Sequence, residues 1–346
     1  MRLVKQISDL DVSGKRVLLR ADLDVPLSSV ELEESSTRLT NLKPSVDLLF
    51  DSNASIIIAG HIGRPEKPDP TLSTKQLIDP LQKILKRTVV FKSDFEDDSV
   101  DVPELASQVT LFENLRFWPG EVACDESFAQ KLATLADFYV NDAFSVCHRN
   151  HASMVVLPKL LPSAAGVHLK DEVDELSKVI KNPDHPLVVI VGGAKIETKL
   201  PVIENLAKIA DFVLVGGELP IEIQKFNTRT AENVIVAELN DDKKDLSSSS
   251  IEKFVKVIKS SKLIVWNGPQ GLFEEGYGHG TLSIARAIIE SGAHSIVGGG
   301  ETTQFLETNK LLSKFSFVSA GGGAMLEFLA GGKLPGLEAL EDVNSK

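Results

Sequence analysis

The sequence is poor in cysteine and lacks long apolar runs. Only two cysteines occur among 346 residues, Cys124 and Cys147, which is too few for a disulfide framework and indicates a reducing compartment. No stretch of 18 or more apolar residues is present, so no membrane-spanning helix is expected. The first twenty residues alternate charged and apolar side chains and do not resemble a signal peptide. These features favour a soluble, cytoplasmic protein.

Positive charge is also in deficit. The chain has 37 Lys and Arg residues and 49 Asp and Glu residues, which gives a net charge of −12. The electrostatic field of such a protein repels nucleic acid and anionic membranes, so binding of either through net charge is excluded. Hydrophobic residues make up 42% of the chain, which is enough for buried cores and unlike a disordered chain. A chain of this length is expected to form about two domains.

Short apolar runs alternate with longer amphipathic stretches along the whole chain. This alternation predicts an α/β fold with two Rossmann-like lobes, each a mostly parallel sheet covered by helices. The runs that indicate strands are 16–20, 55–60, 109–112, 137–140, 187–193, 211–217, 262–268, 294–300 and 315–323.

The loops after these strands differ between the two halves of the chain. First-half loops carry Arg, His and Asp, whereas second-half loops carry glycine pairs and triplets. Because ligands bind beyond the carboxyl ends of parallel strands, we expect one lobe to hold its ligand by side chains and the other by backbone. The expected lobes are 1–168 and 182–333, joined by a linker helix over 169–181, with the tail 334–346 packing back on the first lobe.

The glycine loops have two interpretations. A single glycine pair after a strand is typical of a tight turn, but several such loops in one half favour phosphate binding at helix N-termini. Neither a P-loop nor a GxGxxG motif after a strand is present. Lys195 and Lys199 lie four residues apart after one glycine pair, where a bound phosphate would stabilise them. The alternative is two solvated surface lysines.

Cationic and imidazole side chains cluster in the first-half loops. Together they are suited to a small, multiply charged anion, although each alone is typical of a surface. A zinc site around Cys147 is a minor alternative, because the spacing matches no standard site, and an inert thiol is favoured over a nucleophile. Asp22 and Asp24 either bind substrate hydroxyls or cap a turn. The clustered residues are Arg38, His61, Arg64, Arg116, His148, Arg149 and His151.

Several motifs follow one another in order along nearly the whole chain. They are RVLLRADLDVPL, GHIGRP, LFENLRFWPGE, NDAFSVCHRNHAS, LPSAAG, VGGAKIETKLPVIENL, WNGPQGLFE, GGGETT and SAGGGAMLEFLAGGKLPGLEAL. This series resembles the phosphoglycerate kinases. The resemblance implies a monomeric glycolytic enzyme with small-molecule substrates. In a closed cleft it would transfer a phosphoryl group in line and reversibly from 1,3-bisphosphoglycerate to MgADP, giving 3-phosphoglycerate and MgATP.

The resemblance also assigns residues to roles. Arg38, Lys195 and the Gly321, Gly322, Gly323 helix start would meet the transferred phosphoryl group, and Glu301 would meet nucleotide-bound Mg²⁺. Glycerate binding is implied for Asp22, Asp24, Arg38, His61, Arg64, Arg116 and Arg149. Nucleotide binding is implied for Gly192, Gly193, Lys195, Lys199, Gly216, Asn267, Glu274, Gly298, Gly299, Gly300, Glu301 and Thr302.

The chain departs from the family pattern at several positions. The stretch 217–266 is shorter than usual, which affects the region around the purine pocket. One alternative is therefore a catalytically weakened nucleotide-binding scaffold of the same fold, and another is a phosphotransferase for a related acyl phosphate. Glu301 has the alternative role of a helix cap. The departures are Asp24 for Asn, Glu301 for Asp, Ser145–Val146 for Gly-Thr, Ala320 for Thr and Glu218 for a third Gly.

Overall fold

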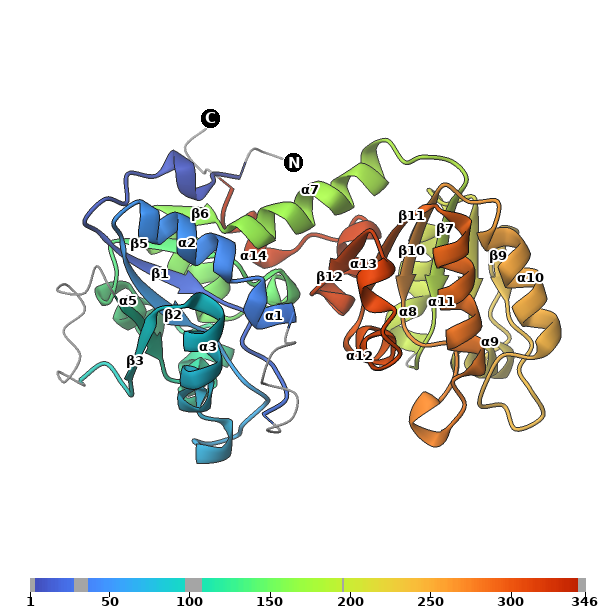
Figure 1. Cartoon of the computed structure of the whole chain (residues 1–346), viewed down its shortest axis with the longest axis horizontal. Helices are drawn as coiled ribbons and strands as arrows, with labels where there is room; N and C mark the ends of the chain where they lie inside the picture. The colour runs from blue at the N-terminus through green and yellow to red at the C-terminus, as the bar shows by residue number, and fades with distance from the viewer. Residues whose placement is uncertain (1–3, 28–36, 97–107, 195, 342–346) are drawn as a thin grey trace. The chain divides into compact units, whose positions relative to one another are not determined.

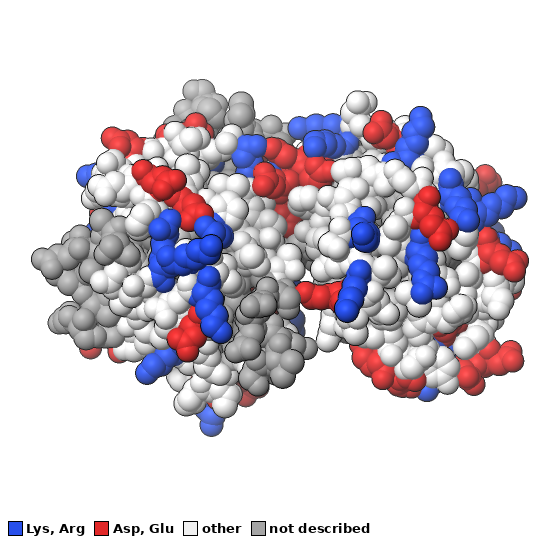
Figure 2. All heavy atoms as spheres, viewed as in Figure 1, with Lys and Arg blue, Asp and Glu red and all other residues white. Residues whose placement is uncertain are grey.

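The chain folds into two compact units, Met1–Val173 with Lys333–Lys346 and Asp174–Gly332. The computed structural model describes residues 4–27, 37–96, 108–194 and 196–341 (Figure 1). Within these ranges, every helix is too short or too polar to cross a bilayer. On the face drawn in Figure 2, both basic and acidic side chains lie on each unit.

The first unit is built on a parallel sheet. In the described residues the sheet has six strands in the order β3-β4-β2-β1-β5-β6, and the central strands are buried on both faces. A parallel sheet covered on both faces requires nearly continuous apolar strands, as VLL and III in β1 and β2 illustrate. The strands are β1 (Arg16–Arg20), β2 (Ser55–Ala59), β3 (Thr88–Lys92), β4 (Gln108–Phe112), β5 (Phe138–Asn141) and β6 (Ser163–Ala165).

Helices cover this sheet, and the chain's tail belongs to the same unit. Gly336 in the last short helix donates its N–H to the Cys147 carbonyl at 2.9 Å. The α-helices are α1 (Thr37–Thr40), α2 (Lys43–Asp51), α3 (Ile78–Leu85), α4 (Pro119–Val122), α5 (Glu126–Thr134), α6 (Leu157–Leu160) and α14 (Pro335–Glu338). Helix α7 (Val167–Lys181) begins in this unit and continues into the second, because the division falls after Val173. Shorter turns are the 3₁₀ segments η1 (Ile7–Asp9), η2 (Pro70–Leu72), η3 (Thr74–Leu77), η5 (Leu115–Phe117) and η6 (Phe144–Val146), and the π-helix η7 (Ala152–Val156).

The second unit contains another parallel sheet. Its described strands run in the order β12-β11-β10-β7-β8-β9, which places a topological switch point between β7 and β10. The strands are β7 (Leu187–Val191), β8 (Phe212–Val215), β9 (Val234–Val236), β10 (Leu263–Asn267), β11 (His294–Gly298) and β12 (Phe317–Ser319). The helices are α8 (Ile196–Leu206), α9 (Leu219–Lys225), α10 (Ser248–Ile258), α11 (His279–Ser291), α12 (Gly300–Thr308) and α13 (Gly322–Leu329), with 3₁₀ turns η8 (Phe273–Glu275) and η9 (Leu312–Lys314).

The two parallel sheets confirm the predicted α/β fold class. Three strands escaped the sequence analysis, and all three lie at sheet edges: β3, β6 and β9. β6 and β9 have only three residues each, and β3 begins with an exposed threonine. An edge strand pairs on one side only, so it needs less apolar sequence than a central strand, and its pattern is correspondingly weak.

Candidate active site

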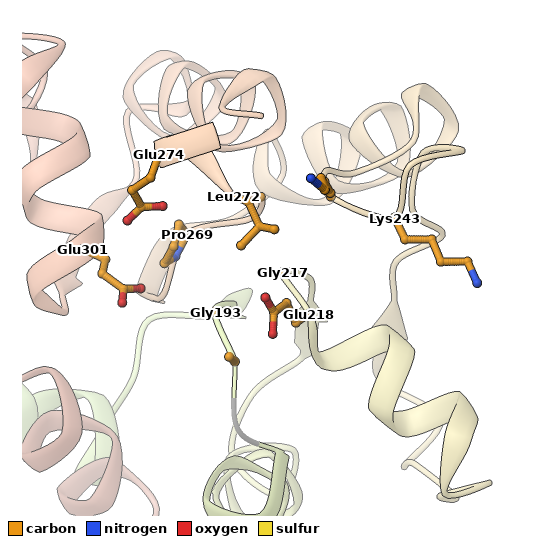
Figure 3. Close-up of a pocket in the computed structure, with 11 residues that line it drawn as sticks. Gly193, Gly217, Glu218, Lys243, Pro269, Leu272, Glu274 and Glu301 are labelled. Carbon is orange, nitrogen blue, oxygen red and sulfur yellow. The ribbon is translucent and has the colours of Figure 1, made fainter. Parts of the chain in front are cut away.

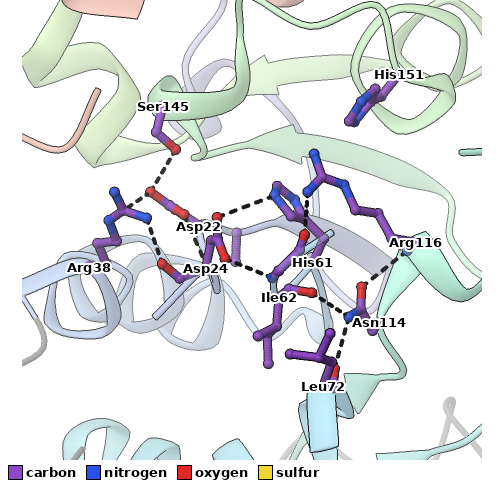
Figure 4. Close-up of polar contacts among 12 residues, drawn as sticks. Asp22, Asp24, Arg38, His61, Ile62, Leu72, Asn114, Arg116, Ser145 and His151 are labelled. Carbon is purple, nitrogen blue, oxygen red and sulfur yellow. Dashed lines mark hydrogen bonds and ion pairs between the residues drawn. The ribbon is translucent and has the colours of Figure 1, made fainter. Parts of the chain in front are cut away.

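Polar side chains gather at the carboxyl edge of the first sheet. Parallel strands end at the same edge, so loops that are far apart in sequence meet there (Figure 4). Asp22 and Asp24 follow β1, His61 follows β2, Arg116 lies in η5 after β4, and Arg149 follows β5.

Asp22 anchors Arg38 in this cluster. The Asp22 side chain is nearly buried, and its Oδ2 accepts a hydrogen bond from Ser145 Oγ at 2.6 Å. The same oxygen lies 3.5 Å from Arg38 Nε, while Arg38 Nη1 donates to the Asp24 carbonyl oxygen at 2.6 Å. Arg38 is still 31% exposed, so its guanidinium remains accessible to a ligand.

Asp24 connects the β1 and β2 loops. Its Oδ1 accepts the Gly63 N–H at 2.8 Å, and its Oδ2 lies 3.8 Å from His61 Nε2. This contact joins two loops rather than capping a turn, whereas the contact within the β1 loop is from the Asp24 N–H to Asp22 Oδ1 at 3.4 Å. Binding of a substrate hydroxyl by the second oxygen stays a prediction.

Three arginines crowd beside these carboxylates. Burial, followed by the nearby Arg149, lowers the pKa of Arg116 to about 10. Burial and then Arg64 lower the pKa of Arg149 as well. A pKa near 10 still leaves Arg116 protonated at neutral pH, and its like-charged neighbours raise the energy of that charged form. A bound anion would relieve this repulsion.

Several buried polar atoms at this edge are unsatisfied. Among the described residues, Arg116 Nε, His148 Nδ1 and His151 Nδ1 are buried without a hydrogen-bond partner. Burial is the largest cause that lowers the pKa of His151 to about 3, and Arg20 is the second, so the ring is neutral. Because an unpaired buried polar group is costly, such atoms favour a ligand at this edge.

Two buried groups that support this cluster, Arg20 and Glu121, were not predicted from the sequence. Arg20 ends the apolar strand β1, is fully buried, and hydrogen-bonds to His61 and Ser153. Glu121 in α4 is also fully buried and contacts Ser153. The available signal for Arg20 was an arginine directly after the apolar residues Val17–Leu19 of β1, at the end where ligands bind. No local pattern marks Glu121, whose partners lie far away in sequence.

The second unit has a pocket at the carboxyl ends of its central strands. Glu218, Glu274 and Glu301 supply carboxylates, and the lining glycines follow β7, β8 and β10 (Figure 3). The pocket therefore lies at the topological switch point of the sheet, the usual ligand position in this architecture. Its described lining residues are Gly193, Ala194, Gly217, Glu218, Lys243, Lys244, Pro269, Gly271, Leu272, Glu274 and Glu301.

The glycines of this unit serve two different purposes. A Cβ on Gly217 would lie 2.4 Å from the Gly193 nitrogen, and one on Gly268 would lie 2.3 Å from the Gly192 oxygen, so these loops pack backbone against backbone. In contrast, a Cβ on Gly300 or Gly323 would meet nothing within 4 Å. These two glycines lie in the first turns of α12 and α13, where open space and helix N–H groups suit an anion.

Other predicted nucleotide residues hold the loops together. Lys199 Nζ donates to the Gly192 carbonyl, and Asn267 Nδ2 donates to the Gly322 carbonyl at 3.0 Å. The Thr302 hydroxyl is buried and accepts the Gly268 N–H at 3.0 Å. Lys195 lies outside the described residues. Gly216 and Gly298 are closely packed. Gly299 precedes α12 with a φ of 101°, and Gly321 precedes α13.

A family model described as phosphoglycerate kinase matches residues 7–240 and 220–332. The chain belongs to the phosphoglycerate kinase family. Membership identifies it as a kinase, a nucleotide-binding transferase of glycolysis. The two matched segments overlap at 220–240, within the stretch that the sequence analysis describes as shortened.

Full-length relatives support this assignment. The chain is 34% identical to phosphoglycerate kinase of Aquifex aeolicus over 390 aligned positions, and 35% identical to that of Desulfosudis oleivorans over 392, with 98% of this chain and 98–99% of each relative covered. Both alignments are longer than the 346-residue chain, so the relatives contain residues that have no counterpart here.

Solved structures of the family have the same fold. Phosphoglycerate kinase from Coxiella burnetii matches with a TM-score of 0.80 at 30% identity, over 98% of this chain and 99% of its own. The Pyrococcus horikoshii phosphoglycerate kinase matches with a TM-score of 0.85 at 28% identity, over 97% and 98% of the two chains.

Proposed function

We propose that the protein catalyses reversible phosphoryl transfer from 1,3-bisphosphoglycerate to MgADP, giving 3-phosphoglycerate and MgATP. The observation that carries this proposal is the crowded, partly unsatisfied group of cationic side chains at the carboxyl edge of the first sheet. In the reaction, the bond between phosphorus and the acyl oxygen breaks, and an ADP β-phosphate oxygen forms the new bond. The carboxylate leaves without needing a proton.

The glycerate and its phosphate bind in the first unit. Arginine guanidinium groups match phosphate and carboxylate oxygens in pairs, and the neutral imidazole of His61 adds a further polar contact. Asp22 and Asp24 orient Arg38. Their carboxylates accept hydrogen bonds from substrate hydroxyl groups. The binding residues are Asp22, Asp24, Arg38, His61, Arg64, Arg116 and Arg149.

The nucleotide binds in the pocket of the second unit. Open space beside Gly300 and Gly323 leaves room for phosphate oxygens at the N-termini of α12 and α13. Gly192, Gly193, Gly216 and Lys199 shape the neighbouring loop, and Glu274 lines the pocket where it can meet ribose hydroxyls. Lys195 is assigned to the phosphates from its family motif alone.

Magnesium, which the family implies, fits the donors at this pocket. Among the described residues, no group of three or more His, Cys, Asp and Glu is arranged to hold a metal ion unaided. Nucleotide-bound Mg²⁺ needs only one or two protein carboxylates, because phosphates and water supply its other ligands. Glu301 lines the pocket at the start of α12 and would hold the ion, which neutralises phosphate charge when bound.

Catalysis then depends mainly on position and charge neutralisation. Phosphoryl transfer requires little covalent chemistry from the protein when the attacking and leaving oxygens are held in line. Arg38 and the first N–H groups of α13, at Gly322 and Gly323, stabilise the charge on the moving group. Asp22 contributes indirectly, because it holds the Arg38 guanidinium in place.

A coupled assay of ATP formation from 1,3-bisphosphoglycerate and MgADP tests the proposal. Turnover that saturates in both substrates is expected. The scaffold alternative predicts nucleotide binding by calorimetry without turnover, and the related-substrate alternative predicts turnover with acetyl phosphate in place of 1,3-bisphosphoglycerate. Either result would overturn the assignment. A cytoplasmic location and a monomeric state stay predictions.

A further inference from the structure

A chain of buried polar groups runs behind the glycerate site. Arg20, at the end of β1, donates from Nε to Ser153 Oγ at 3.0 Å. Ser153 in η7 donates from Oγ to Glu121 Oε1 at 2.6 Å, and its backbone N–H donates to Glu121 Oε2 at 2.9 Å. All three side chains are fully buried. Hydrogen bonds thus join three separate elements, β1, η7 and α4.

The other end of Arg20 reaches His61. Arg20 Nη2 lies 3.0 Å from His61 Nδ1, and a guanidinium has donors but no acceptor. His61 Nδ1 must therefore accept, which places the ring proton on Nε2. Burial, and next the charge of Arg20, lower the pKa of His61 well below its ordinary value, so the ring is neutral. The ring accordingly has a single defined tautomer.

The Nε2–H of His61 faces Asp24, at the sheet edge where the glycerate ligand is proposed to bind. Nε2 lies 3.8 Å from Asp24 Oδ2, a contact drawn as a dashed line in Figure 4. This separation is longer than a hydrogen bond, so the N–H can still donate to a ligand. A donor at this position attracts an anionic oxygen. The opposite tautomer would present a lone pair to the same oxygen and repel it.

We propose that Glu121, Ser153 and Arg20 form a positioning relay that holds neutral His61 as the Nε2–H tautomer, so that His61 donates a hydrogen bond to the anionic glycerate ligand. This proposal rests on the proposed function for the identity of that ligand. Glu121 Oε1 lies 3.9 Å from Arg20 Nη2, so the carboxylate offsets much of the arginine's charge at the site. The main contribution of Arg20 is therefore orientation of His61 rather than long-range attraction.

Nitrogen NMR of protein labelled with ¹⁵N-histidine tests the tautomer directly. The chain has seven histidines, and a His61→Gln variant identifies the His61 signals by their loss. In the ligand-free wild type, we expect an unprotonated Nδ1 and a protonated Nε2 for His61. A protonated Nδ1 would overturn the relay. This measurement needs no substitution in the relay itself and no substrate.

Ser153→Ala removes the link between Glu121 and Arg20. The control Ser163→Ala removes a hydroxyl in the same unit that donates to the Pro158 and Leu161 carbonyls, away from the site. Ser153→Ala should shift His61 towards the Nδ1–H form and weaken 3-phosphoglycerate binding about tenfold by calorimetry, with ATP affinity unchanged. The control should retain the wild-type tautomer and both affinities.

Arg20→Lys provides a second variant that keeps the positive charge. A single ammonium does not reproduce the fork that joins Ser153 and His61, so the same tautomer shift and binding loss are expected. Unchanged tautomer or unchanged 3-phosphoglycerate affinity in folded variants would overturn the proposal. If the wild type shows the expected tautomer but binds no 3-phosphoglycerate, the relay stands and the proposed function fails.

Discussion

At the scale of single residues, substitutions relative to the family pattern have specific contacts. Ser145 donates to Asp22, which also lies beside Arg38, so this replacement contributes a hydrogen bond to the site. Asp24 accepts the Gly63 N–H with one oxygen and leaves the other near His61. Glu301 lines the pocket of the second unit. At Ser145 and Asp24, the replacing side chain thus makes a contact of its own within the candidate site.

Arg38→Ala tests charge neutralisation at the reacting phosphoryl group. Removal of a donor to a transition state costs on the order of 3 kcal/mol, so turnover should fall about a hundredfold. Arg38 is 31% exposed, and a large loss of stability is not expected. Arg16→Ala is a matched control, because Arg16 is 33% exposed and pairs with Asp137 away from the site. Near-normal turnover of Arg38→Ala in the coupled assay would remove the residue from this role.

Glu301→Gln tests the metal assignment. Loss of the carboxylate charge should raise the magnesium concentration needed for half-maximal rate, with 3-phosphoglycerate affinity unchanged. The alternative role, a favourable charge in the first turn of α12, predicts a slightly lower melting temperature and the wild-type magnesium curve. Magnesium titration at fixed nucleotide, together with thermal unfolding, separates the two. An unshifted titration would contradict the metal role.

At the scale of elements, the shortened stretch 217–266 supplies Gly217, Glu218, Lys243 and Lys244 to the lining of the pocket proposed for the nucleotide. It comprises α9, the three-residue edge strand β9, the loop that carries Lys243 and Lys244, and α10. The apolar side chains among the described lining residues are Ala194, Pro269 and Leu272, and none of those lining residues is aromatic. The described lining therefore offers little surface on which a purine ring could stack.

Weak purine discrimination is the expected consequence. Phosphate contacts are the same for ADP and GDP, and few base contacts are available to distinguish them, so their dissociation constants should agree within about tenfold, or ~1.4 kcal/mol. Calorimetry with each nucleotide and excess magnesium measures this ratio. A hundredfold preference for ADP would show that other residues contact the base and distinguish adenine from guanine.

At the scale of the whole molecule, the two candidate ligand sites belong to different units. The arginine cluster lies within Met1–Val173, and the glycine-rich pocket lies within Asp174–Gly332. Each has the chemistry that suits its proposed ligand: cationic side chains for a small anion, and backbone N–H groups with carboxylates for a magnesium nucleotide. Substitutions at one site should therefore have separable effects on the two ligands.

Arg64→Ala and Arg149→Ala test this separation. Each should weaken 3-phosphoglycerate binding about ten- to hundredfold, because a charge-assisted hydrogen bond is lost, while ATP affinity stays at the wild-type value. Calorimetry with each ligand alone, and with Arg16→Ala as the control, measures both effects. Equal losses for the two ligands would mean that the ligands are assigned to the wrong units.

The sequence alone determined the fold class, the strongly apolar central strands and the polar or glycine-rich loops at their ends, because these are local patterns of residue type and spacing. Only the tertiary structure decided which glycines pack against backbone, as Gly217 does, and which face open space, as Gly300 does. It also brought together Arg20, Glu121 and Ser153, which are separated by up to 133 residues. Such contacts form only when the strands and helices pack together, so the local spacing of residue types does not predict them.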